Sequence, residues 1–325
     1  MTTADRTRPQ LVFVHGIGRP LDPGRALAEW KRALAKGARA AGFASEVSAL
    51  VMDWSADSAF AHYGDLFSPH EAQGAGVAAA SDDEQAQLLI DLLGEFLDSA
   101  NDLREFRGDP RFARVRAQVR PSGEAQGVGA VARRLAAVVA AVAAVPGLRW
   151  GAQQLSAARL LSVLSQPGRY LRRAEPDADG RTLDRRIRDR VLEHLDPARP
   201  AIVVAHSLGS VVALEALAEY SGPVRLFITI GSPLAVRGLV RQRLVPQPPT
   251  TPESVAAWAD FWDDDDLVVP PRLPADVVRP NAAGVRPVST PLTSATLWSH
   301  DATRYLQHPD VARAVMEALT ARTPA

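Results

Sequence analysis

Residues 202–210 read Ile-Val-Val-Ala-His-Ser-Leu-Gly-Ser. The apolar run is typical of a buried strand, and a helical pattern follows Gly209, so Ser207 falls at the turn between them. A serine on a sharp strand-to-helix turn forms a nucleophile elbow. We expect this turn to bring the flanking backbones together, so the residues on either side must be small. Ala205, in place of the usual glycine, and Gly209 meet that need. The plainer alternative is that Ser207 only caps the helix.

The same turn places the N–H group of Leu208 at the start of a helix. Helix starts have unsatisfied N–H donors and the positive end of the helix dipole. Both stabilise a negative oxygen that forms beside the serine. Leu208 is therefore a candidate oxyanion donor.

Strand and helix patterns alternate on both sides of this turn. Residues 11–14 predict a buried strand, residues 22–42 a helix and residues 47–52 a second strand. Further strands are expected at 224–230, 255–262 and 285–289, and further helices at 183–195 and 310–319. Repeated units of this kind predict an α/β fold with a mostly parallel central sheet flanked by helices.

The chain resembles the α/β-hydrolase superfamily, and within it the lipase-like and esterase-like serine hydrolases. Besides the elbow, Phe13-Val14-His15-Gly16-Ile17-Gly18 resembles the strand and loop that supply the second oxyanion N–H group. The resemblance implies that Ile17, or its neighbour Gly18, gives this donor and that His15 braces the loop without transferring protons. Thr229-Ile230-Gly231-Ser232-Pro233-Leu234 resembles the turn that shapes the pocket floor. The substrate pocket is expected to involve the following residues: His15, Gly16, His206 and Ser232.

The acid of such a site follows the serine in the chain. Residues 263–266 are four consecutive aspartates, and the resemblance, aligned on Val269-Pro270, selects Asp266. Asp263 is the alternative acid because it lies closest to the strand end. A cation site and a solvated acidic loop are two other interpretations of the run.

The base must follow the acid, and of the seven histidines only His300 and His308 do so. Residues 297–305 resemble the superfamily's histidine loop, with Tyr305 as the aromatic that often follows the histidine, so His300 is the predicted base. His308 is the weaker choice. His206 is adjacent to the serine, and its side chain is expected to point away from the pocket.

Residues 68–181 interrupt the alternation and match no pattern of the superfamily. Helices are predicted at about 82–106 and 128–145, the second with valines and leucine at helical spacing. A helical cap or lid inserted in one hydrolase domain is the main interpretation. The apolar part, 135–148, is too short and too rich in alanine for a membrane span. The arginines that follow, Arg149, Arg159, Arg169, Arg172 and Arg173, indicate either a helix lying on a lipid surface or a solvated face.

Composition limits the function further. The chain has 325 residues with 37 basic and 37 acidic side chains, which argues against binding nucleic acid through bulk charge. The absence of cysteine excludes a cysteine nucleophile, disulfides and thiolate metal sites. The polar start of the chain predicts a cytoplasmic protein. We expect no cofactor and no metal, and a serine hydrolase that cleaves a carboxylic ester of a lipid or small molecule. The alternatives are a thioesterase, amidase or acyltransferase, or a non-catalytic binding protein of the same fold.

Overall fold

The computed structural model describes residues 8–17, 22–67, 166–236, 240–263, 266, 269, 273–293 and 300–321, with five isolated residues between 90 and 117. Most of the expected cap at 68–181, including both of its predicted helices, lies outside the described residues. Gly18, Asp264 and Asp265 also lie outside them. The cap therefore remains a prediction.

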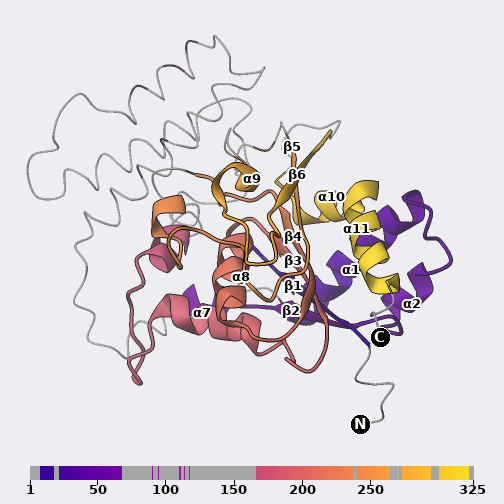
Figure 1. Cartoon of the computed structure of the whole chain (residues 1–325), viewed down its shortest axis with the longest axis horizontal. Helices are drawn as coiled ribbons and strands as arrows, with labels where there is room; N and C mark the ends of the chain where they lie inside the picture. Colours follow the sequence, from indigo (N-terminus) through magenta and orange to yellow (C-terminus); the bar gives the residue numbers. More distant parts are fainter. Residues whose placement is uncertain are drawn as a thin grey trace, which may run out of the picture. The chain divides into compact units, whose positions relative to one another are not determined.

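Six parallel strands form one sheet in the order β2-β1-β3-β4-β5-β6 (Figure 1). Their bounds are β1 Gln10–Val14, β2 Asp57–Ala61, β3 Ala201–His206, β4 Val224–Ile230, β5 Trp258–Asp263 and β6 Val288–Leu292. Every residue of β1 and β3 is buried, which explains their continuous apolar runs. The predicted α/β fold with a parallel sheet is confirmed.

The second strand was predicted at the wrong place. Residues 47–52 contain the short helix α2 (Val47–Val51), in which Val47 and Leu50 are buried at helical spacing. The strand β2 comes later, and it pairs only with β1 among the described strands. Only its last two residues are buried, so this edge strand has little hydrophobic signal. β6 likewise begins three residues later than predicted.

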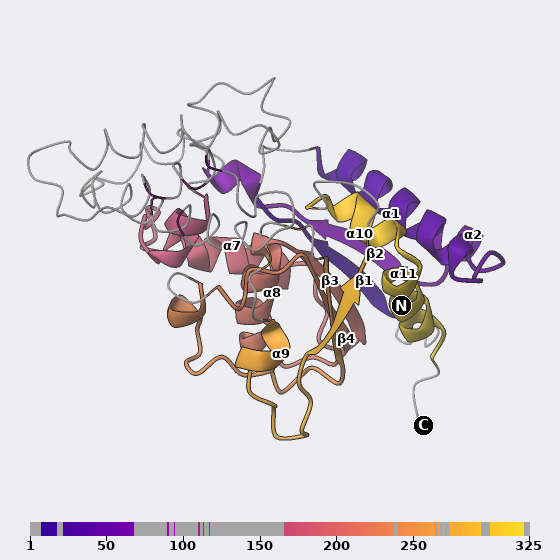
Figure 2. The same cartoon turned by 90° about the horizontal axis from the view of Figure 1, so that it is seen from above.

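Helices cover both faces of the sheet (Figure 2). One face packs against α1 (Pro23–Ala40), α10 (Ala302–Gln307) and α11 (Pro309–Thr320), and these share a core that includes Phe13, Ile228 and Tyr305. The other face carries α8 (Leu208–Glu219), in which every residue from Leu208 to Leu217 is buried. The remaining described helices are α7 (Leu183–Leu192), α9 (Pro274–Val277) and the 3-10 turns η1 (Gly64–Phe67) and η4 (Arg241–Arg243).

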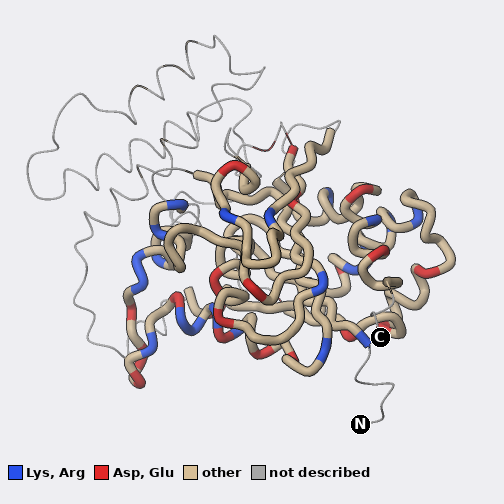
Figure 3. Tube along the Cα trace, viewed as in Figure 1, with Lys and Arg blue, Asp and Glu red and all other residues tan. Residues whose placement is uncertain are grey.

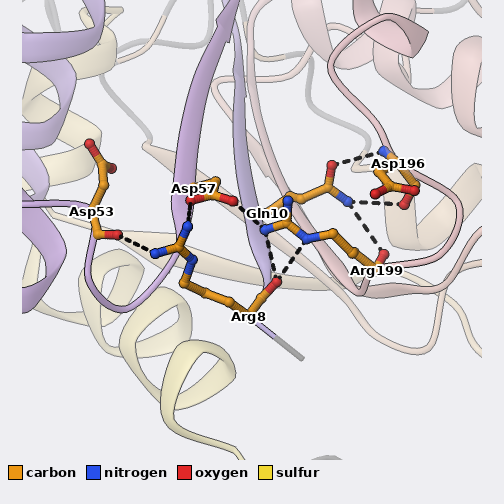
Figure 4. A network of polar contacts seen from close by, with 6 residues as sticks. All are labelled: Arg8, Gln10, Asp53, Asp57, Asp196 and Arg199. Atoms are coloured by element: carbon orange, nitrogen blue, oxygen red, sulfur yellow. Dashed lines mark hydrogen bonds and ion pairs between the residues drawn. The ribbon is translucent and has the colours of Figure 1, made fainter. Parts of the chain in front are cut away.

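A polar network anchors the amino end of the central strand β1 (Figure 4). Arg8 forms an ion pair with Asp57 on β2, and Arg199 donates to the Arg8 carbonyl at 3.0 Å. The side chain of Gln10 accepts from the N–H of Asp196 at 2.8 Å. The network joins β1, β2 and the segment before β3 at one end, so the opposite, carboxyl end of the sheet is left for loops.

The chain divides into two compact units, one of residues 1–65, 186–235 and 244–325, which holds the sheet, and one of residues 66–185 and 236–243. In the second unit, the three described arginines of the predicted basic surface, Arg169, Arg172 and Arg173, have acidic partners, whereas Arg149 and Arg159 lie outside the described residues. Arg169 pairs with Glu175 at 2.5 Å, and Arg173 pairs with Asp184 at 3.0 Å. Acidic and basic residues are interspersed along the described chain (Figure 3). The side chains of Arg169, Arg172 and Arg173 are only 17%, 13% and 25% exposed, so these three form neither of the two expected basic faces.

Candidate active site

The predicted site residues gather at the carboxyl ends of the strands. The chain crosses from β1 to β2 on one side and from β3 to β4 on the other, so these two connections diverge between β1 and β3. In open α/β sheets such a switch point forms a crevice for ligands. Ser207 follows β3, the 15–17 segment follows β1, Asp266 follows β5 and His300 follows β6.

Ser207 has an unusual backbone conformation, with φ 54° and ψ −131°. Residues other than glycine rarely adopt positive φ, and such strain is concentrated at functional sites. The turn is held by two backbone hydrogen bonds, from the N–H of Ser207 to Ile230 at 3.2 Å and from the N–H of Ser210 to the Ser207 carbonyl at 2.9 Å. The serine is therefore the strained residue between strand and helix that the elbow pattern predicts.

Two glycines let the β1 loop approach the elbow. A Cβ atom at Gly16 would lie 2.6 Å from the Cβ atom of Ser207. A Cβ atom at Gly209 would lie 2.6 Å from the carbonyl oxygen of Val14. The expected reason for a small residue at position 209, contact with the backbone around Ala205, is therefore incomplete. The start of α8 also crosses the end of β1, and that crossing needs the glycine.

His300 contacts both the serine and an aspartate. Its Nε2 atom lies 2.8 Å from Oγ of Ser207, and its Nδ1 atom lies 2.8 Å from Oδ2 of Asp266. The side chain of His300 is 11% exposed and that of Asp266 is 0% exposed. The structure thus brings together Ser207, His300 and Asp266 in a continuous hydrogen-bonded relay.

The alternative acid and base have other surroundings. Asp263 is the last residue of β5, and its carbonyl accepts from the N–H of Asp266 at 3.0 Å. His308 caps the helix α11, where its Nδ1 atom accepts from the N–H of Asp310 at 3.3 Å. The carboxylate that is hydrogen-bonded to the imidazole of His300 is that of Asp266.

Tyr305, expected only as the aromatic residue that follows the catalytic histidine, also contacts the acid. The hydroxyl of Tyr305 donates to Oδ2 of Asp266 at 2.7 Å. Burial, and then the charge of Asp266, raise the pKa of Tyr305 well above its usual value, so it remains a neutral donor. The sequence shows the spacing from His300 to Tyr305, but it does not predict the contact between Tyr305 and the acidic loop.

The side chain of His206 is buried beside the base. Its ring lies against His300, with centroids 4.6 Å apart, and Trp30 approaches it edge-on at 6.3 Å. Because side chains alternate along a strand, His206 is on the same face of β3 as Ile202 and Val204. These two residues pack in the core beneath α1 and α10, and the ring of His206 contacts His300 at the end of this face. Burial, and then the proximity of His300, lower the pKa of His206 well below its usual value.

His15 has the contacts of a loop brace. Its Nε2 atom accepts from the N–H of Tyr63 at 3.2 Å, which leaves the proton on Nδ1 to be donated to the Gly16 carbonyl at 2.7 Å. The hydroxyl of Tyr63 donates to the His15 carbonyl, and the two rings stack 4.1 Å apart. Burial, and then the charge of His62, lower the pKa of His15 to about 3, so the ring is neutral.

Ser232 lies under the start of α8. Its hydroxyl accepts from the N–H of Leu234 at 3.3 Å and contacts the hydroxyl of Ser210 at 2.8 Å. Ser210 donates in turn to the Ser207 carbonyl at 2.6 Å. Ser232 is buried, so the Gly-Ser-Pro turn supports the elbow from beneath.

Leu208 and Ile17 flank the serine as predicted oxyanion donors. Leu208 is the first residue of α8, where the N–H groups of a helix have no partner within the helix. Ile17 follows Gly16, whose backbone passes close to Ser207 after the end of β1. Gly18, the neighbouring option, is outside the described residues.

Comparison with known proteins agrees with the fold. The model of a family described as alpha/beta hydrolase fold matches residues 165–305, a range that includes Ser207, Asp266 and His300. The comparisons with curated proteins and with solved structures gave no match. Together with the parallel sheet and its strand order, this match shows an α/β-hydrolase fold. Within the described residues, no helix has the length and apolar character needed to cross a membrane.

Proposed function

We propose that this hydrolase-fold protein is a serine hydrolase with Ser207 as nucleophile, His300 as base and Asp266 as acid. The observation that carries the proposal is the relay of two 2.8 Å hydrogen bonds from Ser207 through His300 to Asp266. Its substrate is a carboxylic ester of a lipid or small molecule.

In the first half of the reaction, Nε2 of His300 takes the hydroxyl proton of Ser207 as Oγ bonds to the carbonyl carbon. Asp266 accepts the Nδ1–H group and stabilises the imidazolium. The N–H groups of Leu208 and Ile17 would hold the oxyanion. The ester C–O bond then breaks, the leaving oxygen takes the proton from His300, and an acyl-enzyme remains.

Water completes the cycle. His300 takes a proton from a water molecule as the oxygen of that water attacks the acyl carbon. The tetrahedral intermediate collapses, Oγ of Ser207 leaves and regains its proton from His300, and the carboxylic acid is released. A thiol or an amine as leaving group, or an alcohol in place of water, would give the thioesterase, amidase and acyltransferase alternatives on the same residues.

The test combines labelling with a substrate panel. Ser45 is exposed and its hydroxyl donates to Glu46 at 2.7 Å, so Ser45→Ala is the control. A fluorophosphonate should label the wild type and Ser45→Ala but not Ser207→Ala. p-Nitrophenyl esters of increasing chain length, with a thioester and an anilide, identify the acyl chemistry. Loss of serine reactivity should reduce turnover by several orders of magnitude in a folded protein. A wild type that is neither labelled nor active on any substrate would overturn the proposal in favour of the binding protein.

A further inference from the structure

Oδ2 of Asp266 accepts two hydrogen bonds. Nδ1 of His300 lies 2.8 Å away and the hydroxyl of Tyr305 lies 2.7 Å away. An ionised carboxylate only accepts hydrogen bonds, so both groups must donate to this oxygen. Hydrogen bonds to a charged group that is removed from water are among the strong ones. One buried oxygen thus joins the acid to two residues of the same C-terminal segment.

The tyrosine is fixed more firmly than the acid. Tyr305 is buried in the core on α10, a helix that starts directly after His300 and is capped by Asp301, which accepts from the N–H of Thr303 at 2.8 Å. Asp266 lies three residues beyond the end of β5, in the loop that leaves the sheet. A hydrogen bond from a helix in the core therefore defines where the loop carboxylate lies.

A glycine provides the space for this arrangement. Gly231 has φ +55°, and a Cβ atom there would lie 2.7 Å from Oδ2 of Asp266. The same atom would lie 3.2 Å from Nδ1 of His300 and 3.2 Å from Cε2 of Tyr305. One side chain from the loop after β5 and two from the C-terminal segment thus converge beside one position that lacks a side chain.

We propose that Tyr305 is a positioning residue for Asp266. It turns Oδ2 towards Nδ1 of His300 and, by sharing the charge of that oxygen, keeps the proton on the imidazole. The proposal rests on the serine hydrolase function proposed above. Because Tyr305 acts through the acid, its removal should slow the chemical step and leave substrate binding unchanged.

The kinetic test uses Tyr305→Phe, which removes only the hydroxyl. We expect kcat to fall about tenfold to a hundredfold, the effect of losing one hydrogen bond to a charged group, with KM unchanged. Tyr220→Phe is the matched control, because the buried hydroxyl of Tyr220 has no hydrogen-bond partner in the described structure. In the Asp266→Asn background, Tyr305→Phe should have no further effect on kcat. A wild-type kcat for Tyr305→Phe would overturn the proposal. So would a double variant whose loss of kcat equals the product of the losses in Tyr305→Phe and Asp266→Asn.

A second readout needs no substrate. The imidazole N–H proton of a histidine bound to a carboxylate resonates far downfield in the proton NMR spectrum. That signal should be lost in Asp266→Asn, shift in Tyr305→Phe and stay unchanged in Tyr220→Phe. If the wild type hydrolyses nothing but the signal responds in this way, the serine hydrolase function fails while the positioning contact stands. A signal unchanged by Tyr305→Phe would refute the positioning role whatever the activity.

Discussion

Gly231 borders the acid of the relay: a Cβ atom at this position would lie 2.7 Å from Oδ2 of Asp266. We expect Gly231→Ala to displace the carboxylate and reduce kcat/KM about a hundredfold, the scale of a displacement near 1 Å in an active site. The variant should also lose stability, because alanine is strained at φ +55°.

The control for Gly231→Ala separates backbone strain from the clash. Gly284 has φ +79° and nothing within 4 Å of a built Cβ atom. Gly284→Ala should lower the melting temperature to a similar degree but leave ester hydrolysis unchanged. Equal losses of activity in both variants would show that strain alone, and not contact with Asp266, is responsible.

The choice of acid makes a second prediction. Asp266→Asn should lower kcat by about 10³- to 10⁴-fold, as when a triad carboxylate is neutralised. Asp263→Asn should lower kcat less than about tenfold, because His300 is hydrogen-bonded to Asp266. Steady-state kinetics on a soluble ester decide the question. If Asp263→Asn is the crippling change, the assignment is wrong by three residues.

The sequence predicted most of this site because its signals are local. The elbow at Ser207 and the His15-Gly16 loop come directly after strands. The acid and the base follow later strands, in the expected order. The hydrogen bond of Tyr305 could not be predicted, since it depends on where the loop after β5 folds against α10. The contact of the His206 ring with His300 could not be predicted either, since it joins two segments that are far apart in the sequence. β2 was missed because an edge strand buries few side chains.

The strain at Ser207 gives a third prediction. Both Ser207→Ala and Ser207→Gly remove the nucleophile, but only glycine accepts φ 54° and ψ −131° without strain. Relief of the strain, of about 1–3 kcal/mol, exceeds the extra unfolded-state entropy of glycine, of about 0.4–1 kcal/mol. Ser207→Gly should therefore be more stable than Ser207→Ala by about 1 kcal/mol in urea unfolding. The opposite order would mean that the elbow is not strained.

The last prediction concerns Asp260, a carboxyl buried in the sheet beneath the site. Trp258 donates to Oγ1 of Thr229 at 3.0 Å, and the hydroxyls of Thr229 and Ser289 donate to the two oxygens of Asp260 at 2.6 and 2.7 Å. Burial raises the pKa of Asp260 from 3.8 to about 6, although the two hydroxyls oppose the rise. Between these values the folded state binds more protons than the unfolded state.

Stability from this group is therefore present at low pH and is lost as the pH rises from about 4 to about 6, with a slope approaching 1.4 kcal/mol per pH unit. The buried neutral histidines have the opposite dependence, because an unfolded histidine binds a proton below about pH 6.5. The comparison must therefore be between Asp260→Asn and the wild type, in which those contributions cancel. The free energy of unfolding of the variant, relative to wild type, should rise between pH 4 and 6 and level off above. A difference that does not change with pH would show that Asp260 titrates alike in both states and that burial does not raise its pKa.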